Sequence, residues 1–517
     1  MARRVADPGP SMTAHALFRC DASPKIGAGH LTRCLALAEA LVETGWRVEF
    51  AVDPQTRATM QGLGAGEFRV NELSGIEQDE PAKLRGYFPD GVDLLVTDHY
   101  QRDIAFERAC RGFARRILVL DDATGRHHDC DFLVDAAANN PSTYAGCVPA
   151  NTKLLLGPSY ALVRRAFIER RADALRRRDG RGVKNILVSF GATDPLNLTS
   201  VTLDALGGCT GEISITVALS SRAPHVETVR HKLRDGMRLV LDADMATLMT
   251  EADIAIGAAG ASSYERAVLG LPSIIAVIAE NQRGIAKILG DAGAAVDAGP
   301  LNPAVATRLG QIVRELIAKP SARTHLSEAC APLVDGCAAQ RLLIALAGAI
   351  TTSTGYDVRL RLADSNDERW LFQLQQAPQT RRHFRNAQTP RADEHARWMA
   401  RTLADQNVLF LVIEADRDRA GYVRLDKLHG KEAAFEISLA VRPQFYRHGV
   451  ASAALKLARR VQPAAVFDAE ILPDNIASKA LFTRAGFRHV NGNHYQQVPA
   501  FFEAKRRNHL ENRGIAS

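Results

Sequence analysis

A histidine that follows two glycines at the start of a helical pattern is the residue of this sequence best suited to chemistry. Gly27, Gly29 and His30 follow a short apolar run and precede leucines spaced as on one helix face. The glycines allow close approach of a ligand, and free N–H groups at a helix start favour an anion such as a diphosphate. His30 is then placed to act as a general base beside a phosphate ester, with Arg33 one turn further on. An ordinary strand-to-helix turn with a surface histidine is the alternative.

Polar and small residues recur where other predicted strands end. Asp98 and Tyr100 lie at the end of one strand, and Glu265 lies in a helix that follows another. Small residues and hydroxyls at a helix start suit an anion cradle, with a serine as N-cap. The residues of such loops are Gly191, Asn197, Gly260, Ser262, Ser263, Asn281 and Gln282. Each alone also fits a cap, a surface charge or packing, but their recurrence at strand ends favours one nucleotide site.

Two series of apolar strands and amphipathic helices must position these residues. Strands are predicted at 16–19, 47–52, 94–98, 117–121 and 132–135, and again, after a basic helix, at 185–190, 213–218, 239–241, 254–256 and 273–278. Strands that alternate with helices are typical of βαβ units and parallel sheets. The sequence therefore predicts two α/β domains, at residues 14–165 and 166–348, with ligands bound in a cleft at the carboxyl ends of the strands.

The pattern changes after a short polar linker, Ala349–Tyr356. Strands predicted at 358–362, 409–413, 419–425, 434–441 and 465–471 make an α+β domain over residues 357–495. One strand leads into a turn and then a helix, and outward-facing N–H groups in such a turn are typical of a pyrophosphate site. This strand ends at Val441, the turn contains Arg447, His448 and Gly449, the helix begins with Val450 and Ala451, and the next strand is followed by Asn475 and Ser478.

Composition limits the class of protein. The chain has 517 residues, 46% hydrophobic and 24% charged, which is typical of a globular protein of about three domains. No apolar run approaches the roughly 18 residues that cross a bilayer, and the N-terminus lacks the apolar core of a signal peptide. Eight cysteines without a C-x-x-C pair predict neither a zinc site nor a disulfide framework, but mostly buried thiols in a reducing cytoplasm.

The net charge of +7 lies largely in two basic runs, Arg164–Arg181 and Lys505–Arg513. Nucleic acid is one interpretation of such runs, but no aromatic residues interleave with them. We interpret them as solvated helix faces, and we expect the tail Phe501–Ser517 to fray.

The first two predicted domains, over residues 14–345, resemble a known enzyme family. The motifs that carry the resemblance are Gly27-x-Gly29-His30-x-x-Arg33-Cys34, Asp98-His99-Tyr100, Asp121-Asp122, His128-Asp129-Cys130-Asp131, Gly157-Pro-x-Tyr160, Asp194-Pro-x-Asn197, Glu265 and Asn281-Gln282. They are similar to those of the UDP-2,4-diacetamido-2,4,6-trideoxy-β-L-altropyranose hydrolases of the bacterial pseudaminic acid pathway. The resemblance implies a metal-independent enzyme with two Rossmann-like domains in GT-B arrangement.

The same resemblance implies that water attacks the anomeric carbon with inversion and that UDP leaves. His30 would deprotonate or orient that water, with Tyr100 assisting at the same centre and Asp98 orienting His30. Glu265 would bind the ribose hydroxyls. The diphosphate and sugar would be held by the glycine loops together with Arg33, Asn281 and Gln282.

The third predicted domain resembles the GCN5-related N-acetyltransferase family. Its turn and helix are followed by Asn-Ile-Ala-Ser at 475–478 and Ala-Gly-Phe at 485–487. The resemblance implies acetyl-CoA as co-substrate, with the turn on the pyrophosphate and Asn475 on the pantetheine arm. Glu436 would act as base for the acceptor amine, with a salt-bridged strand carboxylate as the alternative. Tyr446 and Phe482 depart from the family pattern, the latter where many members have a tyrosine that protonates the leaving thiolate.

Together these features predict a bifunctional enzyme of pseudaminic acid biosynthesis. The third domain would acetylate the 4-amino group of a UDP-sugar, and the first two domains would hydrolyse the product to the free sugar and UDP. The predicted partners are the UDP-sugar and acetyl-CoA, without nucleic acid, membrane or metal. Two alternatives are a GT-B glycosyltransferase fused to an acyltransferase of another amino-sugar pathway, and a third domain that serves only in assembly.

Overall fold

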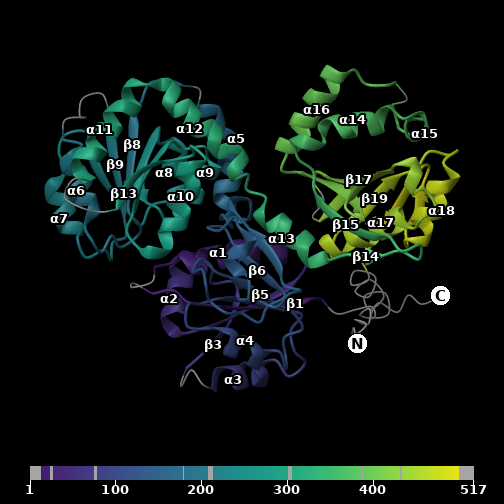
Figure 1. Cartoon of the computed structure of the whole chain (residues 1–517), viewed down its shortest axis with the longest axis horizontal. Coiled ribbons are helices and arrows are strands. Elements are labelled where there is room, and N and C mark those ends of the chain that lie inside the picture. Colours follow the sequence, from purple (N-terminus) through teal and green to yellow (C-terminus); the bar gives the residue numbers. More distant parts are fainter. Residues whose placement is uncertain are drawn as a thin grey trace, which may run out of the picture. The chain divides into compact units, whose positions relative to one another are not determined.

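The computed structural model of the chain describes residues 13–23, 27–74, 79–178, 180–207, 213–300, 305–386, 388–430 and 433–499. Residues 15–39 and 48–339 form one compact unit, and residues 340–499, with 40–47, belong to a second. Two of the three sheets lie in the first unit and the third sheet lies in the second (Figure 1). The basic run Lys505–Arg513 and the tail Phe501–Ser517 are outside the described residues.

Seven strands form the first sheet, in the order β3-β2-β1-β4-β5-β6-β7. They are β1 (His15–Cys20), β2 (Arg47–Val52), β3 (Arg69–Glu72), β4 (Leu94–Asp98), β5 (Ile117–Leu120), β6 (Phe132–Asp135) and β7 (Lys153–Leu156). Helices α1 (Gly29–Glu43), α2 (Pro54–Gly62), α3 (Glu80–Tyr87) and α4 (Ile104–Cys110) connect several of them. The central strands are continuous apolar runs because helices cover both faces of a parallel sheet.

The strand order of this sheet reverses between β1 and β4, which are parallel neighbours. Their last residues, Cys20 and Asp98, pair directly. In a doubly wound sheet, ligands bind at such a switch point, beyond the carboxyl ends of the strands. The loops that follow β1 and β4 are therefore the place to look for a site.

The second sheet repeats this plan with the order β10-β9-β8-β11-β12-β13, all parallel. Its strands are β8 (Asn185–Ser189), β9 (Ser214–Leu219), β10 (Met237–Leu241), β11 (Ile254–Ala258), β12 (Ser273–Val277) and β13 (Val296–Pro300). Its helices are α5 (Arg165–Arg177), α6 (Leu198–Ala205), α7 (Val226–Lys232), α8 (Met245–Glu251), α9 (Ser262–Val268), α10 (Arg283–Asp291), α11 (Val305–Ala318) and α12 (Pro320–Leu333), and α13 (Ala338–Ala347) follows. Two such domains within one unit make the expected GT-B arrangement.

The switch point of the second sheet lies between β8 and β11, where Gly257 pairs with Ser189. A Cβ on Gly257 would lie 2.2 Å from the carbonyl oxygen of Ser189, so only glycine lets the two strands approach this closely. The loops after these strands, which hold Gly191 and Gly260, thus leave the sheet side by side.

The basic run of α5 is solvated only in part: Arg165 and Arg176 are exposed, as expected, whereas Arg171 and Arg178 have a structural role. Arg171 donates to the carbonyl oxygens of Val268, Val334 and Ala331, and Arg178 donates to those of Leu269, Ala252 and Met249. Guanidinium groups that meet the free carbonyls at helix ends are stabilising there.

One stretch, Pro320–Ala347, is long and apolar enough to cross a membrane by length and composition. The sequence analysis expected no apolar run of that length. Half of its most apolar window is buried inside the protein, and the helix is interrupted between Leu333 and Ala338. Leu326 and Cys330 belong to the hydrophobic cores of the second domain. The stretch therefore packs as two core helices.

Eight strands form the third sheet, in the order β14-β15-β16-β17-β18-β19-β21-β20. They are β14 (Ile350–Thr351), β15 (Asp357–Leu362), β16 (Val408–Ala415), β17 (Asp418–Lys427), β18 (Ala434–Val441), β19 (Val466–Glu470), β20 (Arg488–Asn491) and β21 (His494–Gln497). Its helices are α14 (Glu368–Gln376), α15 (Pro378–Arg381), α16 (Ala392–Ala404), α17 (Val450–Val461) and α18 (Ile476–Arg484). The expected linker Ala349–Tyr356 contains β14, which pairs with β15 and so belongs to the sheet.

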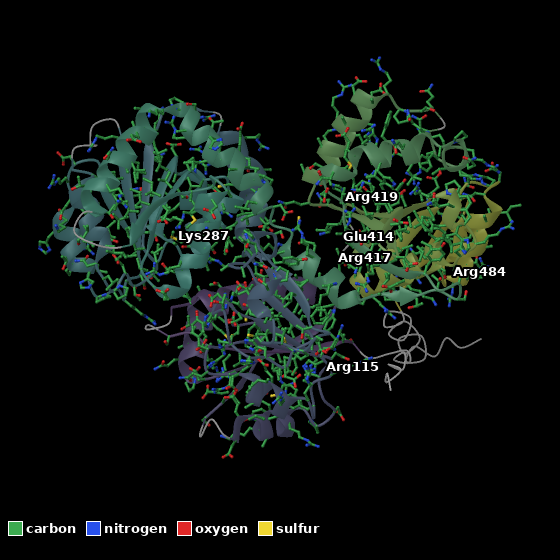
Figure 2. All side chains as sticks on the ribbon, viewed as in Figure 1. Arg115, Lys287, Glu414, Arg417, Arg419 and Arg484 are labelled. Carbon is green, nitrogen blue, oxygen red and sulfur yellow. The ribbon has the colours of Figure 1, made fainter. Side chains whose placement is uncertain are left out.

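All pairs of this sheet are antiparallel except β18 with β19, which are parallel over only three residue pairs. The two strands therefore separate after Glu436. β18 itself continues to Val441, and α17 is the next α-helix along the chain. At the β16–β17 hairpin, Glu414 and Arg419 are cross-strand neighbours (Figure 2).

Candidate active sites

His30 lies at the switch point of the first sheet and is held by a carboxylate. It is the second residue of α1, it is buried, and its Nδ1 lies 2.6 Å from Oδ1 of Asp21. Before α1, Gly27 has φ +85° and exchanges two backbone hydrogen bonds with Ser23. With Nδ1 engaged by Asp21, Nε2 is the nitrogen of His30 available to a reactant.

Asp21 follows directly after β1, and it lies between two imidazoles. Its Oδ2 is 3.6 Å from Nε2 of His99, whose Nδ1 accepts the backbone N–H of Gln101. Burial and the nearby Arg19 lower the pKa of His99 to about 3, so His99 is neutral and its proton is on Nε2, facing Asp21. The Asp21 carboxylate is therefore oriented from both sides.

Burial by itself would lower the pKa of His30, but the charge of Asp98 and the hydrogen bond to Asp21 outweigh it and the pKa is raised. A raised pKa makes the neutral imidazole a stronger base. The arrangement can therefore accept a proton at Nε2 and stabilise the resulting charge through Asp21.

Asp98 was expected to orient His30, and here the structure differs. Both oxygens of Asp98 accept hydrogen bonds from the Arg33 guanidinium, at 2.5 and 2.6 Å, and its nearest oxygen is 3.8 Å from His30 Nδ1. A bidentate pair of this kind holds both groups rigidly. Asp98 thus acts on His30 by charge, while the orienting hydrogen bond comes from Asp21.

Tyr100 connects the first domain with the second. Its hydroxyl donates to Oδ1 of Asp122 at 2.8 Å and accepts from the Asn281 amide at 2.9 Å. Its ring meets that of His30 edge to face, with centroids 4.5 Å apart. Burial and Asp122 hold the pKa of Tyr100 well above its usual range, so the phenol stays protonated and serves as a hydrogen-bond donor.

The residues expected to hold the nucleotide surround the switch point of the second sheet. Glu265 is ion-paired with Arg164 at 2.8 Å, and the Gln282 amide lies 3.5 Å from where a Cβ on Gly260 would be. Two loop residues have left-handed backbones, Gly191 with φ +98° and Asn197 with φ +52°. The expected serine N-cap is wrong, because Ala261 is the N-cap of α9 and no side chain caps it. Ser262 and Ser263 are the first two residues of the helix, and both hydroxyls accept hydrogen bonds from Arg266.

The motif around His128 has a structural role. His128 is fully buried, with Nδ1 2.6 Å from Glu107 and Nε2 3.1 Å from Asp121. Although burial opposes it, these two hydrogen bonds raise the pKa of His128 to about 9. The imidazolium ties α4 to the end of β5, beside Asp122 of the site.

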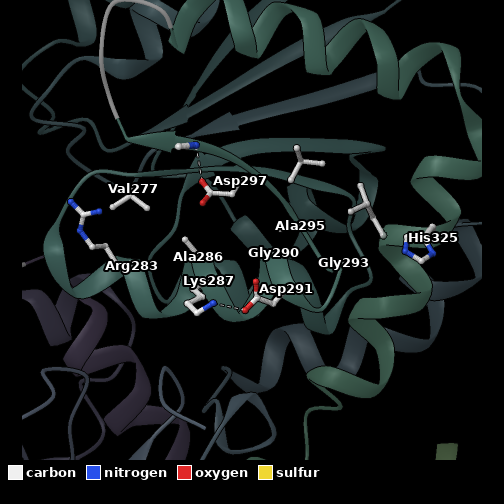
Figure 3. Close-up of a pocket in the computed structure, with 13 residues that line it drawn as sticks. Val277, Arg283, Ala286, Lys287, Gly290, Asp291, Gly293, Ala295, Asp297 and His325 are labelled. Atoms are coloured by element: carbon white, nitrogen blue, oxygen red, sulfur yellow. Dashed lines mark hydrogen bonds and ion pairs between the residues drawn. The ribbon is translucent and has the colours of Figure 1, made fainter. Parts of the chain in front are cut away.

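A groove elsewhere in the second domain does not belong to this site. It has a cavity volume of about 670 Å³ and lies along α10 and β13 (Figure 3). Its exposed cations Arg283 and Lys287 are paired with Glu280 and Asp291. None of the predicted site residues lines it.

The turn before α17 has the conformation expected of an anion-binding loop. Arg447 and Gly449 have φ of +65° and +78°, and α17 begins at Val450. The first N–H groups of a helix have no partner within it, so those of Val450 and Ala451 are free to bind a ligand. Thr354 donates to the carbonyl oxygen of His448 at 3.0 Å and holds the turn in place.

Across from this turn, Asn475 caps α18, because its Oδ1 accepts the N–H of Ser478 at 3.0 Å. Val441 closes β18 opposite Gly421. Phe482 is buried against Phe487, with ring centroids 4.8 Å apart, so no hydroxyl is supplied at that position.

Glu436 is paired with Arg385, which also binds Glu470 on the adjacent strand. The side chain of Glu436 is 29% exposed, so solvent can reach it beside the point where β18 and β19 separate. Both the salt-bridged state and a role as base fit this placement, since Arg385 is itself exposed and can move away from Glu436.

Comparison with known proteins identifies both units. Residues 357–488 match the acetyltransferase (GNAT) domain family. The spore coat polysaccharide biosynthesis protein SpsG of Bacillus subtilis is 34% identical over 330 residues, which cover 62% of this chain and 94% of that protein. The UDP-2,4-diacetamido-2,4,6-trideoxy-beta-L-altropyranose hydrolase of Campylobacter jejuni is 29% identical over 54% of this chain and 98% of its own length.

A third relative is the UDP-N-acetylglucosamine--N-acetylmuramyl-(pentapeptide) pyrophosphoryl-undecaprenol N-acetylglucosamine transferase of Phenylobacterium zucineum. It is 25% identical over 61% of this chain and 93% of that protein. Relatives of the GT-B part thus include both a hydrolase and a transferase, while the GNAT domain is an addition to it.

Proposed function

The chain belongs to the family of the spore coat polysaccharide biosynthesis protein SpsG and carries a GNAT domain, and on this premise we propose a bifunctional sugar-modifying enzyme. Its first unit hydrolyses UDP-2,4-diacetamido-2,4,6-trideoxy-β-L-altropyranose to UDP and the free sugar. Its second unit N-acetylates the UDP-4-amino-sugar precursor with acetyl-CoA. The observation that carries the hydrolase assignment is the buried His30–Asp21 pair at the switch point of the first sheet.

In the proposed hydrolysis, Nε2 of His30 takes a proton from water as the water attacks C1 of the sugar, and the bond from C1 to the diphosphate breaks. Asp21 accepts a hydrogen bond from Nδ1–H of His30 and so stabilises the imidazolium that forms. A positioned base of this kind contributes about 10²–10⁴-fold to the rate. UDP is a good leaving group, so the remaining task is to hold the diphosphate.

Tyr100 and Asn281 are placed to shape the site from the two domains. In the free enzyme the Tyr100 hydroxyl is shared between Asp122 and Asn281. A sugar hydroxyl or N-acetyl group can replace either contact when the substrate binds. Glu265 and the loops around Gly191 and Gly260 are the proposed ribose and diphosphate contacts.

In the second unit we assign acetyl-CoA to the turn at Arg447–Ala451 and to Asn475, and we assign the role of base to Glu436. The amine nitrogen of the acceptor attacks the thioester carbonyl, its proton passes to Glu436, and CoA leaves as the thiol. With Phe482 in place of a phenol, solvent or another group supplies the proton to the leaving sulfur.

The deciding experiment incubates the purified chain with the UDP-4-amino-sugar, with and without acetyl-CoA, and follows products by NMR. We expect UDP and a free diacetamido sugar only when acetyl-CoA is present. A His30→Gln variant should then accumulate the acetylated UDP-sugar, and a Glu436→Gln variant should leave the precursor unchanged. If neither acetylation nor UDP release occurs in the presence of acetyl-CoA, the substrate assignment is wrong.

The relationship to an N-acetylglucosamine transferase favours one rival, a glycosyltransferase with a sugar acceptor in place of water. The same incubation separates the two. Acetylation without release of UDP, followed by release when a sugar acceptor is added, would establish the transferase and exclude the hydrolase.

A further inference from the structure

Arg266 is a buried cation without an ion-pair partner among the described residues, next to the loop proposed for the diphosphate. Its side chain is 1% exposed, the largest of the fully buried side chains. It donates to the carbonyl oxygen of Ala258 at 2.7 Å and to the hydroxyls of Ser263 at 2.8 Å and Ser262 at 3.4 Å. The guanidinium therefore lies directly beneath the turn from Gly257 to Ser263.

No carboxylate among the described residues is within ion-pair distance of Arg266. The nearest acid in sequence, Glu265, is already paired with Arg164. The Nε of Arg266 is buried and has no hydrogen-bond partner in the described part of the chain. Burial lowers the pKa of Arg266 to about 10, and the charge of Glu265 opposes this lowering only in part. Burying an unpaired charge is costly, so such a residue is expected where a ligand completes the balance.

Arg178, which follows α5, provides a contrast, because it binds the carbonyl oxygen of Leu269 at the C-terminal end of α9. It is half-buried, burial lowers its pKa to about 10, and no carboxylate in the described part of the chain lies within hydrogen-bond distance of it. Three helix-end carbonyls accept its hydrogen bonds, including that of Leu269 at the end of α9. Arg266 donates to one carbonyl oxygen and two neutral hydroxyls. The two arginines thus differ in their surroundings, because Arg178 meets only carbonyls at helix ends, whereas Arg266 lies at the loop proposed to hold the diphosphate.

We infer that Arg266 is the positioning cation for the diphosphate of a nucleotide. It would attract the diphosphate by its charge and hold the Ser262 and Ser263 hydroxyls and the Gly257–Ser263 backbone in place. A Cβ on Gly257 would lie 2.9 Å from the nearer guanidinium nitrogen, so only the thin glycine backbone separates the charge from that side of the turn. The field of a buried cation is weakly screened there, and a dianion gains more from it than a neutral nucleoside does. This inference rests on the proposed nucleotide site.

The test compares binding of UDP and uridine by isothermal titration calorimetry in the full chain and in Arg266→Gln and Arg266→Lys variants. Loss of a charged contact is expected to weaken UDP binding about 10- to 100-fold in Arg266→Gln. Uridine binding should stay unchanged, because uridine carries no phosphate. Arg266→Lys should recover part of the UDP affinity, since it restores the charge.

Arg178→Gln is the matched control. It should lower the melting temperature of the free protein and leave the ratio of UDP to uridine affinity unchanged. Arg266→Gln also removes hydrogen bonds to Ala258, Ser262 and Ser263, so its melting temperature without ligand should fall as well. Only in Arg266→Gln should the stabilisation by added UDP shrink.

An equal loss of UDP and uridine binding in Arg266→Gln would mean a structural role and overturn the inference, as would unchanged UDP binding. Wild-type protein that binds no UDP would overturn both the inference and the proposed function. If the protein binds UDP through Arg266 but hydrolyses no UDP-sugar, the proposed function would be wrong and the inference about Arg266 would stand.

Discussion

Oδ1 of Asp21 lies 2.6 Å from Nδ1 of His30, and the two residues belong to different elements, one just after β1 and the other in the first turn of α1. The pair is buried and is supported on its far side by the neutral His99. This relationship turns a histidine at a helix start into an oriented base.

Replacing Asp21 by asparagine should change both the rate and its pH dependence. The carboxylate helps to raise the pKa of His30 against burial, so in Asp21→Asn that pKa falls and the acid limb of kcat/KM moves to lower pH. The maximal rate should drop by up to about 10²–10⁴-fold. UDP release measured across pH gives both quantities. Asp103→Asn, which keeps an N-cap in α4, is the control. A variant whose acid limb coincides with that of the wild type would exclude the coupling.

Tyr100 and Asn281 should behave as one unit. Tyr100→Phe removes the hydroxyl that accepts a hydrogen bond from the Asn281 amide. This change and a substitution of Asn281 should each cost about 0.5–1.5 kcal/mol in transition-state stabilisation. Because the two groups contact each other, the double variant should lose less than the sum of the single losses. A double-mutant cycle on kcat/KM measures this difference, and strict additivity would show that the contact plays no part in the reaction.

Stability should depend on pH through His128. Its pKa is about 9 in the folded protein and 6.5 for the free side chain, so its ion pairs stabilise fully below pH 6.5 and are lost as pH rises towards 9. The contribution is on the order of 3 kcal/mol. The melting temperature of wild type minus that of His128→Gln should therefore be larger at the acid end of this window. His231→Gln, at an exposed histidine of α7, should show no such trend. A constant difference would contradict the assignment of a buried imidazolium.

Asn475 offers a way to separate CoA binding from folding. Its Oδ1 caps α18, and Asn475→Asp keeps that oxygen while removing the Nδ2 donor. We expect the KM for acetyl-CoA to rise about 10-fold, with the melting temperature unchanged and hydrolysis of acetylated UDP-sugar intact. Asn475→Ala should show the same KM effect together with a loss of about 1 kcal/mol of helix stability. Loss of hydrolysis in Asn475→Asp would mean that the two sites depend on each other.

Much of the fold could be read from local patterns. The central strands β1, β4, β8 and β11 are continuous apolar runs, because a parallel sheet buries both faces of its inner strands. The sequence analysis missed β3, β7 and β13, which lie at the edges of their sheets and are short or interrupted by charged residues and glycine. It also missed β20 and β21, whose residues are largely polar and exposed.

The sequence by itself determined the two enzyme families and the residues placed at strand ends, His30 and Tyr100 among them, because those follow from residue type and local spacing. Only the tertiary structure decided which groups meet. Asp21 rather than Asp98 orients His30, Asn281 reaches Tyr100 across 181 positions, and the Nε of Arg266 has no hydrogen-bond partner among the described residues. Such pairings depend on separations of about an ångström between side chains from distant segments. Strand order, helix position and side-chain rotamer together determine those separations, so a local sequence pattern does not predict them.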